Sequence, residues 1–124
     1  MSAPRTVIVP TPDGSVVVPE PDWCTQHGTD RLNHRVFTHY GDDFHITVDT
    51  PGGPRMLLTG FLQQRPFARD GAPTDVVYAL ELSDGDSVAY DPEQLRAVYQ
   101  SIVDQARVLL DRADQLEVIR GGER

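Results

Sequence analysis

The residues best suited to metal chemistry lie in one stretch of the chain, residues 21–39. This stretch holds the only cysteine, the only tryptophan and three of the four histidines. Thiolate and imidazole are side chains that zinc prefers, and four of them complete a tetrahedral site. The spacing therefore predicts a zinc site with the ligands Cys24, His27, His34 and His39. Four protein ligands leave no open coordination position, so such a zinc would be structural rather than catalytic.

Two other interpretations of this stretch stay open. Cys24 and His27 are three residues apart, which suits a thiol–imidazole pair for nucleophilic catalysis. A loop does not fix that geometry, however, and no helix N-terminus follows the cysteine to activate it. Ordinary packing is the second alternative, because single cysteines are commonly buried as small hydrophobic residues. We therefore assign no catalytic residue and expect that the chain is not an enzyme.

Composition and charge narrow the classes of partner. Nineteen acidic residues against eleven basic ones give a net charge of −8, whereas a nucleic-acid binder needs a positive footprint on phosphates. All eleven basic residues are arginine, so no lysine is available for a Schiff base or a phosphate-binding loop. The N-terminal residues do not resemble a signal peptide, and no apolar run approaches the roughly 20 residues that span a bilayer. We expect a cytoplasmic protein that binds neither nucleic acid nor membrane.

Short runs of β-branched and aromatic residues, separated by turn residues, predict most of the strands. The polar segment 25–33 predicts a loop. Residues 35–39 are expected to pair with residues 44–49, which would place His39 beside Phe44. The predicted strands are 5–9, 15–18, 35–39, 44–49, 55–64, 75–82 and 87–90.

A long amphipathic helix is predicted to close the chain. Asp91 suits the N-cap, Pro92 the first helical position and Gln94 a capping box. Apolar residues then recur at helical spacing as far as Leu116, which indicates a helix of about 26 residues that ends before Gly121. The apolar face is wide, so we expect it to lie across a sheet. A monomer and a homodimer through this helix both stay open.

Together these elements predict an α+β fold. It consists of an antiparallel β-meander of five to seven strands with one long C-terminal amphipathic helix packed on one face. Residues 1–124 are expected to form a single domain, with residues 1–4 and 120–124 frayed.

The chain resembles a family of small actinobacterial proteins of unknown function. The resemblance rests on the P-x-W-C-x-x-H segment at Pro21, Trp23, Cys24 and His27, followed by His39 in a strand. It implies that Cys24, His27 and His39 belong to one motif, and it gives less support to His34. If His34 does not belong to the motif, a fourth ligand would be water or a carboxylate. The resemblance offers Glu20, at a position where relatives carry a second cysteine, and the further carboxylates Asp22, Asp30 and Asp43.

Three hypotheses for function follow. The leading one is a small non-enzymatic module, stabilised by zinc, that binds or regulates another protein. The second is a small-molecule-binding domain or enzyme with a pocket near Cys24 and His39. The third is an acidic phage or mobile-element protein that inhibits a basic partner, and only the charge of −8 supports it. The first two depend on whether Cys24 and the histidines converge in space.

Overall fold

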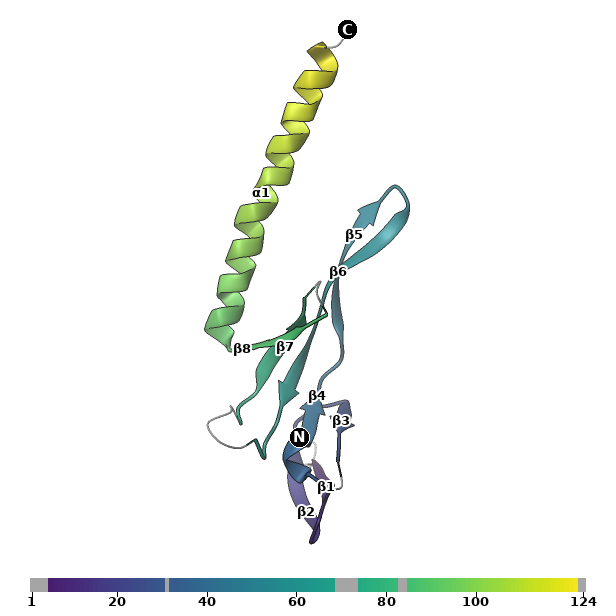
Figure 1. Ribbon diagram of the computed structural model, residues 1–124, viewed down its shortest axis with the longest axis vertical. Coiled ribbons are helices and arrows are strands. Elements are labelled where there is room, and N and C mark those ends of the chain that lie inside the picture. The colour runs from purple at the N-terminus through teal and green to yellow at the C-terminus, as the bar shows by residue number, and fades with distance from the viewer. Residues whose placement is uncertain (1–4, 31, 69–73, 83–84, 123–124) are drawn as a thin grey trace. The chain divides into compact units, whose positions relative to one another are not determined.

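The computed structural model describes residues 5–30, 32–68, 74–82 and 85–122 (Figure 1). The chain divides into two compact units. Residues 1–91 hold all the described strands, and residues 92–124 hold one long helix. The class is α+β, with antiparallel sheets and a long C-terminal helix, as the sequence predicts. The packing of the helix on a sheet face stays a prediction.

A separate two-stranded antiparallel sheet opens the fold. It pairs β1 (Arg5–Thr11) with β2 (Gly14–Glu20), and their β-branched residues favour the extended backbone. Gly14 begins β2 with a φ of 139°, which glycine tolerates because it has no Cβ. Because β2 ends at Glu20, the hairpin delivers a carboxylate to the start of the segment that holds Cys24.

A six-stranded antiparallel sheet contains the remaining strands. They are β3 (Gln26–Gly28), β4 (Thr38–Tyr40), β5 (Phe44–Thr50), β6 (Gly53–Gln64), β7 (Val77–Glu81) and β8 (Ser87–Tyr90). The order is β3-β4-β6-β7-β8, and β5 also pairs with β6. The long strand β6 is therefore the centre of the sheet (Figure 1). The described strands number eight in two sheets, where the sequence predicts one meander of five to seven.

The predicted pairing of residues 35–39 with residues 44–49 is wrong. The strands β4 and β5 instead pair with successive stretches of β6. The reason is the length of β6, whose twelve residues offer one edge to both strands. The backbone N–H of Gly41, between β4 and β5, donates to the Leu62 carbonyl at 2.9 Å and keeps the connection on this edge. Within the predicted loop 25–33, β3 forms and pairs with β4.

A small hydrophobic cluster of the first unit lies beside the start of β4. Val9, Val18 and Phe37 form its buried part, and Val7 and Phe67 pack against them. The side chain of Phe37 is 1% exposed, and this residue directly precedes β4. Phe37 therefore anchors the start of β4, the strand that carries His39, in the core.

The helix α1 (Pro92–Gly122) begins where the sequence predicts, with Pro92 in its first turn. It is 31 residues long and includes Gly121 and Gly122, because a glycine costs a helix only about 1 kcal/mol. Residues 120–122, predicted as frayed, are therefore helical, while residues 1–4 and 123–124 lie outside the described residues. Among the described residues, no helix has the length and apolar character needed to span a membrane.

Candidate metal centre

Four side chains from the first unit converge on one point. Glu20, Cys24, His27 and His39 each offer one ligand atom, and these four atoms lie within 4.8 Å of one another. The residues come from the end of β2, the turn after it, β3 and β4. The convergence joins residues that are up to 19 positions apart in the chain.

Backbone hydrogen bonds explain how the sequence brings these residues together. The N–H of Cys24 donates to the Pro21 carbonyl at 3.0 Å, which turns the chain back after β2. The N–H of Thr25 then donates to the Tyr40 carbonyl at 2.8 Å and starts the pairing of β3 with β4. In this pairing His27 lies directly opposite His39. Residues directly opposite in an antiparallel pair point to the same face, so both imidazoles reach the same site.

The distances between the four ligand atoms are those of a compact polyhedron. Cys24 Sγ lies 3.3 Å from His27 Nε2 and 3.3 Å from His39 Nδ1. Glu20 Oε1 lies 3.4 Å from His39 Nδ1 and 2.7 Å from His27 Nε2. A tetrahedral zinc with bonds of about 2.0–2.3 Å holds its ligand atoms about 3.3–3.6 Å apart. Of the six edges of such a tetrahedron these distances cover four: three match the expected length, and the fourth is a hydrogen bond that needs to open by less than about 1 Å.

The site has a buried side and a side that faces solvent. Cys24 is 6% exposed and His39 is 1% exposed, whereas 28% of the His27 side chain is accessible. Aromatic rings fix both imidazoles. His27 stacks on Phe37 with ring centroids 5.4 Å apart, and His39 meets the same ring edge-on at 4.9 Å. Phe37, which belongs to the core, therefore contacts both imidazoles and helps to position them.

The pKa shifts of Glu20 and His39 favour the states that bind a divalent cation, whereas the shift of Cys24 does not. Burial, together with the neighbouring Glu20, raises the pKa of Cys24 to about 11. Burial also pushes the pKa of Glu20 upward, but hydrogen bonds from Cys24 and His27 and the nearby imidazoles outweigh it, so this pKa lies below its ordinary value. Burial lowers the pKa of His39, with Glu20 acting in the opposite direction, and this favours the neutral imidazole that binds metals.

A bound cation would reverse the state of the cysteine. Metal ligands must be deprotonated, so binding releases the thiol proton of Cys24. The thiolate and the Glu20 carboxylate then carry two negative charges, which a divalent cation balances. Without a cation, the raised pKa of Cys24 keeps it a thiol near neutral pH. A nucleophilic cysteine needs a lowered pKa, so this environment does not suit the thiol–imidazole catalysis considered above.

Three of the four predicted ligands meet in the site, and His34 does not. His34 opens the short 3₁₀ helix η1 (His34–Val36), and its ring lies edge-on to Phe67 with centroids 5.3 Å apart. Glu20 takes the fourth place. The other carboxylates considered from the resemblance, Asp22, Asp30 and Asp43, are outside the cluster. The sequence feature that points to Glu20 as a member of the site is its position at the end of a β-branched strand, four residues before Cys24.

Comparisons with known proteins place the chain in a family without assigning an activity. No curated protein and no solved structure matches it. Residues 6–118 match a family described as Domain of unknown function (DUF6907), and this range includes all four converging residues. The match covers most of both units. The chain therefore belongs to the DUF6907 family, which confirms the resemblance to an uncharacterised family.

Proposed function

We propose that this protein is a zinc-stabilised, non-catalytic module that acts by binding another protein. The observation that carries the proposal is the convergence of one thiol, one carboxylate and two imidazoles within 4.8 Å. These donors tie the end of β2 to β3 and β4. A cation there would add a cross-link to segments that also share the β3–β4 pairing and the small core around Phe37.

The donor set favours zinc over calcium and magnesium. Calcium and magnesium prefer oxygen ligands, and this site offers only one carboxylate beside nitrogen and sulfur. Zinc accepts sulfur, nitrogen and oxygen in a tetrahedral arrangement and has no redox chemistry of its own in proteins. The charge balance with one thiolate and one carboxylate also fits a divalent ion.

Four protein donors favour a structural role over a catalytic one. Catalytic zinc sites keep three protein ligands and a fourth position for water or substrate. Here Glu20 completes the set, and it lies close to both imidazoles, at 2.7 Å from His27 and 3.4 Å from His39. The buried positions of Cys24 and His39 also limit access to the cation from two sides.

An exposed apolar face on β5 supports the protein-binding part of the proposal. Side chains alternate along a strand, so Phe44, Ile46 and Val48 share one face of β5. Their exposed fractions are 61%, 40% and 39%. A contiguous exposed apolar face of this kind is typical of a surface that another protein covers. This face belongs to the sheet that contains β3 and β4, so the zinc would stabilise the structure that presents it.

The zinc content of the purified protein tests the metal part of the proposal. Elemental analysis of tag-free protein, purified without chelator, is expected to find about one zinc per chain. Cys24→Ser is expected to lose most of it, because the variant removes the only thiolate donor. His34→Ala is the matched control and is expected to retain zinc, since this histidine lies against Phe67. Zinc that is absent from the wild type, or equal in Cys24→Ser and wild type, would contradict the proposal.

Cross-linking in the native host tests the protein-binding part. The wild-type protein is expected to cross-link to a specific partner, and Ile46→Asp is expected to lose it by placing a charge on the apolar β5 face. Thr47→Asp is the control, because the neighbouring residue points to the opposite face. Equal capture of the partner by the two variants would place the contact elsewhere on the protein. Turnover of a small molecule by the purified protein would overturn the non-catalytic assignment.

A further inference from the structure

The apolar residues of α1 follow the seven-residue repeat of a coiled coil. Successive residues of this seam are alternately four and three positions apart, a mean spacing of 3.5 residues. The residues of the seam are Leu95, Tyr99, Ile102, Ala106, Leu109, Ala113 and Leu116. A repeat of this period marks the line along which a second helix packs, because two helices that wind slowly around each other keep these residues in contact.

No residue of α1 is buried, and the exposed fractions of Tyr99, Leu109 and Leu116 are 65%, 73% and 54%. Most of the stability of a protein helix comes from packing its apolar face rather than from helix propensity. A helix of 31 residues with this face therefore needs an occupant for it.

We propose that the occupant is α1 of a second copy of the chain, packed antiparallel. The two-fold axis passes between Arg107 and Val108, which places Ala106 opposite Leu109 of the second copy. The same register places Ala113 opposite Ile102, and Tyr99 opposite Leu116, of the second copy. The proposed interface lies in the helical unit and does not require the proposed zinc site in residues 1–91.

The sizes of the seam residues favour the antiparallel arrangement. In the proposed register each alanine meets a large aliphatic side chain and the tyrosine meets a leucine, so no layer holds two alanines or two tyrosines. A parallel pair in register would place Ala106 on Ala106 and Ala113 on Ala113, and Tyr99 on Tyr99. Two underfilled layers and one overfilled layer would result, and both faults destabilise a core.

The residues that flank the seam match in the same register. Arg96 lies opposite Glu117 of the second copy, which pairs opposite charges on both ends of the dimer. The apolar flanks also pair with each other, since Val98 meets Ile119 and Val103 meets Leu110 of the second copy. Flanking charges of this kind select partner and orientation in helix pairs.

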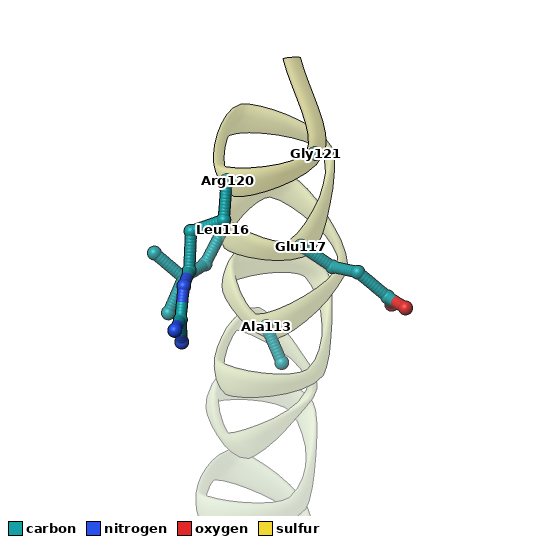
Figure 2. Close-up of a pocket in the computed structure, with 5 residues that line it drawn as sticks. All are labelled: Ala113, Leu116, Glu117, Arg120 and Gly121. Carbon is teal, nitrogen blue, oxygen red and sulfur yellow. The ribbon is translucent and has the colours of Figure 1, made fainter. Parts of the chain in front are cut away.

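The surface of the helix near its C-terminus has the shape that this packing requires. Ala113, Leu116, Glu117, Arg120 and Gly121 line a shallow hollow, in which Leu116 and Arg120 lie together on one flank and Glu117 extends to the other (Figure 2). The small side chain of Ala113 leaves room there. In the proposed dimer the Ile102 side chain of the second copy fills this room.

Sedimentation of the full chain tests whether the seam is a dimer interface. The wild type is expected to sediment with twice the chain mass at about 100 µM, a concentration well above the dissociation constant of a stable helix pair. Leu109→Glu is expected to weaken the dimer at least about 100-fold, because it places a charge in the centre of the seam in both copies. Val108→Glu is the matched control, since the neighbouring side chain lies off the seam, and it is expected to leave the dimer intact.

Mixing two charge variants tests the orientation. Arg96→Glu and Glu117→Arg are each expected to weaken their own dimers several-fold by opposing like charges. In an antiparallel pair, a mixture of the two restores both ion pairs, so the mixed dimer is expected to recover the wild-type dissociation constant. No recovery in the mixture would overturn the antiparallel register. A wild-type monomer at about 100 µM, or equal effects of Leu109→Glu and Val108→Glu, would overturn the dimer itself.

Discussion

Removal of zinc with a chelator is expected to lower the unfolding temperature of residues 1–91 by at least about 15 °C. A ligand at about 1,000 times its dissociation constant stabilises the folded state by about 4.1 kcal/mol. In a domain of about 60–100 residues, each kcal/mol shifts the unfolding temperature by roughly 4–8 °C. The effect is large because the buried cluster beside the site is small and, among the described residues, consists of Val9, Val18 and Phe37.

Trp23 provides the measurement. It is the only tryptophan, and its ring lies edge-on to His39 with centroids 6.3 Å apart, so its fluorescence reports on the first unit and its site. Thermal melts are compared for zinc-loaded, chelated and zinc-reconstituted protein. Cys24→Ser is the control and is expected to melt at one temperature regardless of zinc. Superimposable wild-type melts with and without zinc would contradict a structural role for the cation.

Phe37→Ala is expected to destabilise the first unit by about 3–5 kcal/mol. The ring is 1% exposed within the small core, and its removal leaves a cavity that the surrounding strands cannot close. The same ring contacts both imidazoles, at 5.4 Å from His27 and 4.9 Å from His39. The variant is therefore expected to bind zinc more weakly as well, although it removes no ligand.

Chemical denaturation followed by Trp23 fluorescence measures the loss of stability, and a competition titration with a zinc-binding dye measures the affinity. Phe44→Ala is the matched control, because this phenylalanine is 61% exposed on β5, and its change is expected to stay within about 0.5 kcal/mol. If the two variants are equally stable, Phe37 does not support the site in the way that its burial indicates.

The elements with strong local signals could be predicted from the sequence. The β-branched runs on either side of a Pro-Asp-Gly turn predicted the first two strands, and Asp91 followed by Pro92 predicted the start of α1. Local conformational preference and capping decide these features, and both are properties of neighbouring residues. Gly121 and Gly122 led to a predicted helix end that is too early, because a helix tolerates glycine near its end at a modest cost.

The site could be predicted only in part, because its completion depends on strand pairing. The types and spacing of Cys24, His27 and His39 identified three of the four residues that converge. The choice between His34 and Glu20 depends on the pairing of β3 with β4 and on the turn after β2, and neither has a strong local signal. The Asn33 side chain accepts from the N–H of Arg35 and starts η1, which directs His34 to Phe67 instead.

X-ray absorption at the zinc edge is the most direct test of the metal centre. It measures the number, type and distance of the atoms bound to the cation in the wild-type protein. The structure predicts one sulfur at about 2.3 Å and three nitrogen or oxygen atoms at about 2.0–2.1 Å, from Cys24, His27, His39 and Glu20. A six-coordinate shell of nitrogen and oxygen without sulfur would show that zinc binds elsewhere and would contradict the site.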